Sequence, residues 1–180
     1  MHKLWRWNLH GHISLLPFTL LYAVFCFVVY GARSWGLRRG VVICVGERLG
    51  RMFPGTGAQT IGGCTIYANT TEELREDLHV HENCHVVQAQ AAALLGQVVV
   101  PLAFAAIDWP IPIGCAIGGP VGALGYSLVY GFCFLGAWTI RGFGPWRDAY
   151  HANPFEVQAY RRQTTWLHSM TAEQRKAVWS

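Results

Sequence analysis

The chain has 180 residues, a length typical of one domain, with 52% hydrophobic and only 13% charged residues. Soluble domains have about 25% charged residues, so this composition favours a membrane protein over an ordinary soluble one. Eight Trp, nine Phe and seven Tyr supply enough apolar surface to exclude disorder. The net charge of +4 is small and the Arg residues are scattered, which argues against nucleic-acid binding and fits the cytoplasmic loops of a membrane protein.

The six cysteines form no Cys-x-x-Cys pair, and two lie inside apolar runs. This pattern favours mostly buried thiols in a reducing compartment over a disulfide framework. The cysteines are Cys26, Cys44, Cys64, Cys84, Cys115 and Cys133.

Three uncharged runs are long enough to cross a membrane as helices, which takes about 17–25 residues. The predicted spans are 13–30, 86–107 and 121–140, the last being the part of the uncharged run 109–140 that best fits a helix. Asp108, Pro110 and Pro112 predict a turn between the second and third spans. Two alternatives stay open: the first run as a cleaved signal peptide, and the other two as a buried hairpin of a soluble protein.

The basic residues set the expected orientation, because cytoplasmic loops carry an excess of Lys and Arg. Arg residues follow the first and third spans, whereas the short loop around Asp108 has none. These residues are Arg33, Arg38, Arg39, Arg48 and Arg51 after the first span, and Arg141, Arg147, Arg161 and Arg162 after the third. We therefore expect a multi-pass protein of the cell (inner) membrane, with 33–85 and 141–180 cytoplasmic and the N-terminus outside despite Lys3 and Arg6.

A more polar stretch precedes the second span. Residues 55–63 are rich in Gly and Thr and predict a loop or bent strand, whereas Cys64–Ala68 has the β-branched and aromatic content of a short strand. Thr70 followed three residues later by Glu73 is a capping-box pattern. Nothing breaks the helical pattern before Gly96, so one helix is expected to run from the polar stretch into the second span.

This helix carries the HExxH motif His81-Glu82-Asn83-Cys84-His85. Residues four apart share a helical face, so His81 and His85 can bind one zinc ion. Glu82 is offset by about 100° and can reach a water held by that ion. The pattern therefore predicts a zinc hydrolase in which Glu82 is the general base and the activated water attacks a carbonyl group.

A zinc hydrolase needs a third protein ligand, with the fourth position left for water. The best candidate is Glu156, because Asn153 as a cap and Pro154 at the first helical position place it in the first turn of another helix. The same spacing allows Glu156 to close a capping box with Asn153 instead. The other candidate third ligands are His151, Asp148 and His79.

The sequences HENCHVVQ and NPFEVQAY resemble those of the gluzincin zinc metallopeptidases, and more closely a small membrane-associated bacterial form with HExxHxxQ and a later NPxE. The resemblance implies that His81, His85 and Glu156 bind zinc and that Glu82 is the general base. It also implies that Cys64–Ala68 is an edge strand that pairs with an extended peptide. It covers about 100 residues, from 60 to 160, although the clan's acidic residue after the third ligand is replaced by Ala159 and Tyr160.

Two further residues near the motif have two interpretations each. Tyr160, one turn beyond Glu156, is either an electrophilic donor to the oxyanion of the transition state or an interfacial aromatic anchor. Gln88 either orients a metal ligand or makes a polar contact between membrane helices. Cys84 points away from the His81/His85 face and is expected to pack. The C-terminal stretch 171–179 predicts a short capped helix.

These patterns predict a mainly α multi-pass membrane protein with about three transmembrane helices and a small zincin-like α+β zinc site, forming one domain over 1–180. The expected function is zinc-dependent hydrolysis of peptide bonds in membrane-proximal proteins or peptides, at the membrane surface. The partners are thus a peptide substrate and the lipid bilayer, without nucleic acid. The alternatives are a non-catalytic membrane protein that keeps a structural metal site and, with less support, a membrane di-iron oxygenase, which would need more His or carboxylate clusters.

Overall fold

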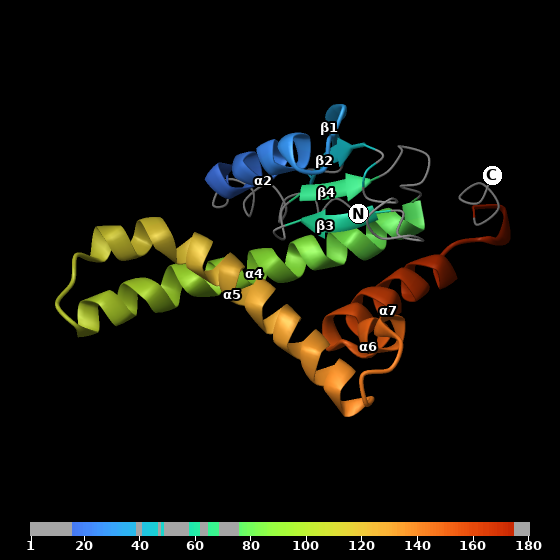
Figure 1. Ribbon diagram of the computed structural model, residues 1–180. Coiled ribbons are helices and arrows are strands. Elements are labelled where there is room, and N and C mark those ends of the chain that lie inside the picture. The colour runs from blue at the N-terminus through green and yellow to red at the C-terminus, as the bar shows by residue number, and fades with distance from the viewer. Residues whose placement is uncertain are drawn as a thin grey trace.

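The computed structural model describes residues 16–38, 41–46, 48, 58–61, 65–68 and 76–174. In chain order its elements are α2 (Leu16–Val28), β1 (Ser34–Arg38), β2 (Val41–Val45), β3 (Ala58–Ile61), β4 (Thr65–Ala68), α4 (Glu76–Ala106), α5 (Ile111–Ile140), α6 (Trp146–Ala152) and α7 (Pro154–His168) (Figure 1). The protein is mainly helical, as predicted, and it also has one small sheet. Some predicted features lie outside the described residues: the start of the span 13–30, parts of the stretch 55–63, Cys64, the capping box of Thr70 and Glu73, and the end of the C-terminal helix.

The four strands form one mixed sheet in the order β1-β2-β4-β3, in which β2 and β4 are parallel and the two outer pairs are antiparallel. Successive side chains of a strand point to opposite faces. Ile43 and Ile66 therefore pack on one face with Val86 of α4. Cys44 and Tyr67 pack on the other face with α2. The sheet is thus a layer between α2 and the first half of α4 (Figure 1).

The prediction that Cys64–Ala68 lies at the edge of the sheet is wrong. The strand predicted at Cys64–Ala68 is observed as β4, which is flanked by β2 and β3 and is therefore interior. The outermost described strand on the side nearest α4 is β3, within the stretch 55–63 that was expected to be a loop or bent strand. The apolar run of β2 causes the difference, because it occupies the side of β4 opposite β3.

The helix α4 is continuous from Glu76 to Ala106 and contains both the HExxH motif and the expected second span. It passes through Gly96 and Pro101 without ending. One rigid helix therefore joins the metal-ligand candidates to the apolar half of the molecule, as the sequence pattern predicted.

The helix expected at 121–140 is longer than predicted. It is observed as α5, which begins at Ile111 directly after the turn, with Pro110 as its N-cap residue. Pro is tolerated in a first turn, since the first N–H groups of a helix have no partner within the helix. The interior Pro120 and the glycines on either side of it lie where α5 crosses α4.

Glycines bring α4 and α5 into backbone contact. Gly114, Gly118 and Gly122 recur every fourth residue along α5, and the last two face the α4 segment that includes Gly96. A Cβ atom at Gly118 would lie 2.7 Å from the carbonyl oxygen of Gly96, and one at Gly122 would overlap the carbonyl oxygen of Ala92. Small residues spaced in this way allow membrane helices to pack closely.

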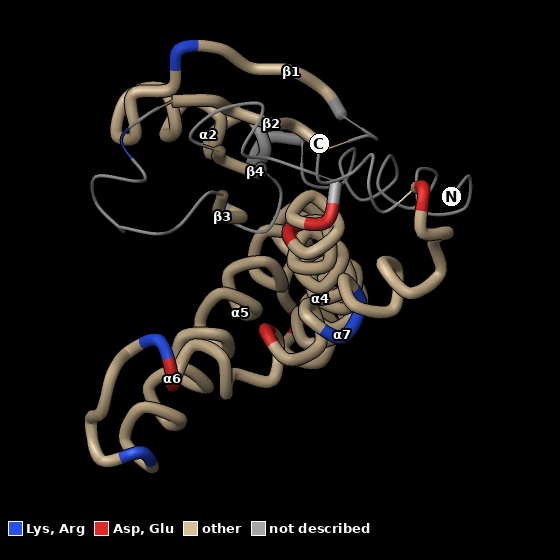
Figure 2. Tube along the Cα trace, turned by 90° about the vertical axis from the view of Figure 1, so that its right-hand side faces the viewer, with Lys and Arg blue, Asp and Glu red and all other residues tan. Residues whose placement is uncertain are grey.

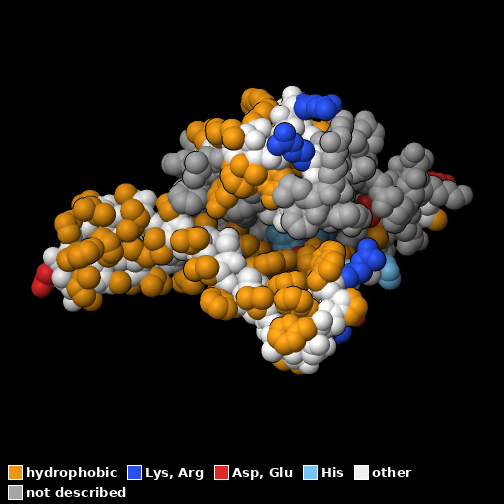
Figure 3. All heavy atoms as spheres, in the orientation of Figure 1, with side chains coloured by type: hydrophobic (Ala, Val, Ile, Leu, Met, Phe, Trp, Pro, Cys, Tyr) orange, Lys and Arg blue, Asp and Glu red, His pale blue; other side chains and the backbone are white. Residues whose placement is uncertain are grey.

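Two helices in the described part of the chain are long and apolar enough to cross a membrane, namely Asp77–Ala106 and Ile111–Ile140. In their most apolar windows only 22% and 6% of the residues are buried, unlike the core helix of a soluble protein. Apolar side chains cover this α4–α5 hairpin (Figure 3). Figure 2 shows charged residues on α4, α6 and α7 and near β1.

Candidate metal centre

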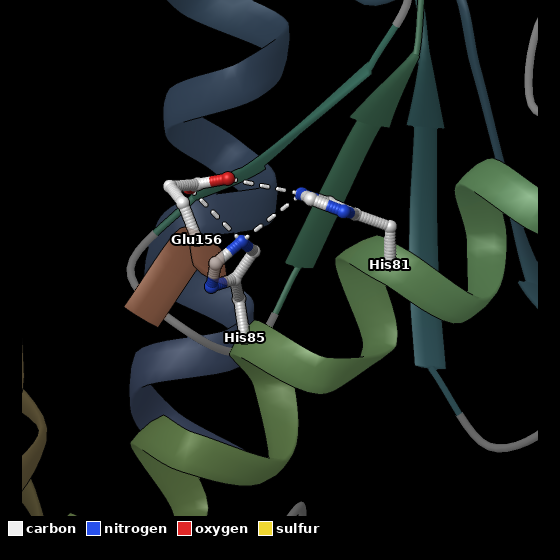
Figure 4. A group of neighbouring side chains, drawn as sticks. All are labelled: His81, His85 and Glu156. Carbon is white, nitrogen blue, oxygen red and sulfur yellow. Dashed lines mark hydrogen bonds and ion pairs between the residues drawn. The ribbon is translucent and has the colours of Figure 1, made fainter. Parts of the chain in front are cut away.

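Three side chains from two helices converge beside the sheet. His81 and His85 lie one turn apart on α4, and Glu156 comes from the first turn of α7 (Figure 4). The two carboxylate oxygens of Glu156 lie 3.1 Å from Nε2 of His81 and 3.1 Å from Nε2 of His85. The two Nε2 atoms are 3.4 Å apart. All three residues are buried, with exposed fractions of 5% or less.

The spacing of these three atoms fits a metal ion. Ligand atoms at about 2.0–2.1 Å from a tetrahedral ion lie about 3.3 Å from one another, close to the observed 3.1–3.4 Å separations. Two imidazoles and a carboxylate are also a donor set that zinc accepts. The buried His81/His85/Glu156 group can therefore hold a metal ion.

The start of α7 directs Glu156 to this point. The side chain of Asn153 accepts a hydrogen bond from the backbone N–H of Phe155 at 3.1 Å, so it caps the helix as predicted. It also donates to the backbone carbonyl of Tyr130 at 3.3 Å, which ties α7 to α5. Because the Glu156 carboxylate is turned toward the two histidines, it is placed as a candidate ligand rather than as the second half of a capping box.

Hydrogen bonds stabilise the charged form of Glu156. Burial favours its neutral form, but hydrogen bonds from His81 and His85 and from the hydroxyl of Tyr130 outweigh burial and hold the pKa of this carboxyl far below its usual range. The Tyr130 hydroxyl donates to Oε1 at 2.6 Å. Glu156 is thus an anion in the protein interior, and such a charge requires a paired cation or several donors.

Glu82 is held by the sheet. Its side chain is 4% exposed, and its Oε2 atom accepts a hydrogen bond of 2.6 Å from the hydroxyl of Thr60 on β3. Thr60 is the register partner of Ile66, so it points to the α4 face of the sheet. The same hydroxyl lies 3.0 Å from the backbone carbonyl of Glu82. The outer strand therefore fixes the position of the candidate base.

The second nitrogen of the His85 ring is also held. Its Nδ1 atom lies 3.0 Å from the side-chain oxygen of Gln88, which also accepts a hydrogen bond of 3.0 Å from the Tyr126 hydroxyl. The amide nitrogen of Gln88 donates to Gln158 at 2.7 Å. Since a carbonyl oxygen can only accept, this contact puts a proton on Nδ1 of His85, and Nε2 is the ring atom that faces Glu156.

Tyrosines surround the carboxylates. Burial, followed by the charges of Glu156 and Glu82, raises the pKa of Tyr150 and that of Tyr160. Tyr160 packs its ring on His81 with the ring centroids 4.4 Å apart, and it is 37% exposed. Sequence reasoning missed Tyr126, Tyr130 and Thr60; a signal for the first two was their four-residue spacing on an uncharged helix.

The rival ligands are not part of the cluster. Asp148 and His151 of α6 are exposed, and the ring of His151 packs against Tyr160 at 5.2 Å. His79 is buried but lies two residues before His81, so it projects from another side of α4. Cys84 is buried as expected, 3.9 Å from a guanidinium nitrogen of Arg162. In the described part of the chain, the group able to hold a metal is His81, His85 and Glu156.

Comparison with protein-family models, with curated proteins and with solved structures gives no match for this chain. The functional argument therefore rests on the site itself.

Proposed function

We propose that this protein is a membrane-embedded, zinc-dependent peptidase that hydrolyses peptide bonds of proteins or peptides close to the bilayer. The observation that carries the proposal is the convergence of His81, His85 and Glu156 beside a buried Glu82. Two histidines and a glutamate with an HExxH glutamate next to them form the donor set expected of a gluzincin. In a zincin-like arrangement of this chain, β3 rather than β4 would be the strand that pairs with an extended peptide.

The chemistry assigns a role to each side chain. Zinc held by His81, His85 and Glu156 would lower the pKa of a water molecule and polarise the scissile carbonyl. Glu82 would take a proton from the water and deliver it to the leaving nitrogen. Oε2 of Glu82 already accepts a hydrogen bond from the Thr60 hydroxyl. Oε1 would therefore be the oxygen that takes the proton from the water. No covalent intermediate is required.

Tyr160 is the proposed donor to the oxyanion of the transition state. Its ring lies against His81, and the residue is more exposed than the metal-ligand candidates. The second interpretation, an interfacial aromatic anchor, agrees with the same exposure.

The proposed setting is the cell (inner) membrane, with the site on the cytoplasmic side and 13–30 as a third span. In support, α2 lies along the hairpin with its N-terminal end toward the hairpin turn (Figure 1). A hydrocarbon layer of about 30 Å corresponds to about 20 helical residues. Counted from the turn at Asp108, that distance ends near Val86 on α4 and near Tyr130 on α5. Both helices would therefore bring their site residues to the same membrane surface.

Metal removal tests the proposed function. The protein in lipid nanodiscs is expected to cleave a fluorogenic membrane-anchored peptide, to lose this activity with a chelator, and to regain it with about one equivalent of zinc per chain. The activity depends on zinc because the activated water does. Cleavage that persists in the fully stripped protein would contradict the proposal, as would the absence of cleavage across a broad peptide library by the zinc-loaded protein.

A further inference from the structure

The sheet layer exposes large apolar side chains on the face that α2 covers only in part. Trp35 and Leu37 of β1 are 68% and 69% exposed. Their register partners on β2 are Cys44 and Val42, which pack toward α2. Trp35 and Leu37 therefore lie on the same face of the sheet as α2. An outermost strand with exposed apolar residues promotes aggregation unless something covers it.

The outward side of α2 continues this surface. The helix buries Tyr22, Ala23 and Cys26 against the sheet. Its outward side chains are apolar and exposed: Leu20, Val24, Phe25, Phe27 and Val28. The apolar surface thus runs without a charged side chain from α2 to the start of the loop before β1.

This surface is continuous with the candidate membrane spans. Tyr22 packs against Ala93 of α4 and Ala123 of α5, near the point where the two helices cross. The part of α2 at Tyr22 therefore lies at the depth of the apolar hairpin. The chain then leaves α2 at Val28 and enters β1 at Ser34, so β1 follows the membrane-facing helix within a few residues.

The charge of the N-terminal part of the chain favours contact with an anionic membrane surface. The first 46 residues contain no Asp or Glu. They contain five basic residues, Lys3, Arg6, Arg33, Arg38 and Arg39. Arg33 is exposed directly before β1. A basic segment of sequence without acidic residues is attracted to anionic headgroups and is not repelled by lipid phosphates.

We propose that β1 rests on the bilayer, with Trp35 and Leu37 in the interfacial layer of an anionic leaflet and Arg33 beside the phosphates. Trp is the residue type that prefers this layer, where its ring is apolar and its N–H is hydrated. Lipid would thus cover the outer strand and hold the sheet, and with it Thr60 of β3, at a fixed height above the membrane. This inference does not depend on zinc or on peptide hydrolysis.

The test measures the depth of Trp35 in the membrane. Wild type and Trp35→Phe are reconstituted in vesicles of phosphatidylcholine and phosphatidylglycerol, and the difference between their emission spectra isolates Trp35. We expect a blue-shifted component that lipid brominated near the headgroup quenches more strongly than lipid brominated near the methyl end. Trp109→Phe is the matched control, because Trp109 is a similarly exposed Trp at the hairpin turn.

Three results would overturn the inference. Emission typical of water, with no quenching, would place β1 away from the membrane. A blue-shifted component without quenching would mean that another part of this chain or a second copy covers Trp35. If quenching of Trp35 does not increase when phosphatidylglycerol replaces phosphatidylcholine, the proposed preference of β1 for an anionic leaflet is excluded. An increase that is smaller in Arg33→Gln supports the contact with phosphates.

Discussion

Replacing Glu82 by Gln is expected to reduce peptide hydrolysis by about 10²–10⁴-fold, the usual contribution of a general base, while zinc stays bound. The amide has nearly the same shape as the carboxylate but cannot accept the proton of the water. Its oxygen can still accept the hydrogen bond from Thr60, so the local structure is expected to survive. The measurements are initial rates on a membrane-anchored peptide and the zinc content of the same preparation.

The control for this variant is Glu173→Gln, because Glu173 is an exposed acidic residue after α7. It should change neither the rate nor the zinc content. Full activity of Glu82→Gln would exclude Glu82 as the base and would favour the non-catalytic interpretation. Loss of zinc in Glu82→Gln would mean that this residue supports the metal site rather than the reaction.

Replacing Gly118 by Ala is expected to destabilise the hairpin by about 1–3 kcal/mol, the cost of overpacking a closely packed contact. The added Cβ would lie 2.7 Å from the Gly96 carbonyl oxygen and 2.8 Å from the Cα atom of Gln97. These are backbone atoms, so the helices must move apart. Because α5 also carries Tyr130, the same change should weaken zinc binding. Unfolding in mixed micelles and a zinc titration measure the two effects.

Gly125→Ala is the matched control on the same helix. Among the described residues, a Cβ added there has no neighbour within 4 Å other than the backbone of its own helix. The substitution should be neutral or stabilise the protein by at most about 1 kcal/mol, since Ala is the better helix former. If the Gly118→Ala and Gly125→Ala variants had the same free energy of unfolding, the close backbone contact between α4 and α5 at Gly118 would be contradicted.

The two histidines could be predicted as metal ligands because helical geometry alone relates them. A four-residue spacing places His81 and His85 on one face in any helix. Asn153 and Pro154 fix the start of α7, and this start puts Glu156 in the first turn. Its convergence with the histidines depends on the tertiary packing of α7 against α4, which the sequence suggested only through the resemblance. The roles of Glu82 and Tyr160 stay predictions.

The residues that support the site could not be predicted with the same rules. Tyr130 donates to Glu156 from a different helix, 26 residues earlier in the chain, so this contact depends on tertiary packing that includes the close approach of α4 and α5. Thr60 contacts Glu82 because β3 pairs with β4 in a register that turns Thr60 toward α4. If β3 were shifted by one residue along β4, the Thr60 side chain would point to the other face of the sheet.

Two misjudged elements had signals in the sequence. The run Val41–Val45 is apolar and β-branched, as in a buried strand, and recognising it would have shown that β4 needs partners on both sides. The recurrence of Gly at 114, 118 and 122 is a spacing for helix packing, and it was a signal that the helix extends before Val121, as α5 does.

The most direct test of the central claim is the metal content of the purified protein, measured by elemental mass spectrometry for wild type, Glu156→Ala and His151→Ala. We predict about one zinc per chain in wild type and in His151→Ala, and a sharp loss in Glu156→Ala, because that carboxylate faces both histidines. Zinc retained in Glu156→Ala, or no zinc in wild type after reconstitution, would contradict a His81/His85/Glu156 metal centre.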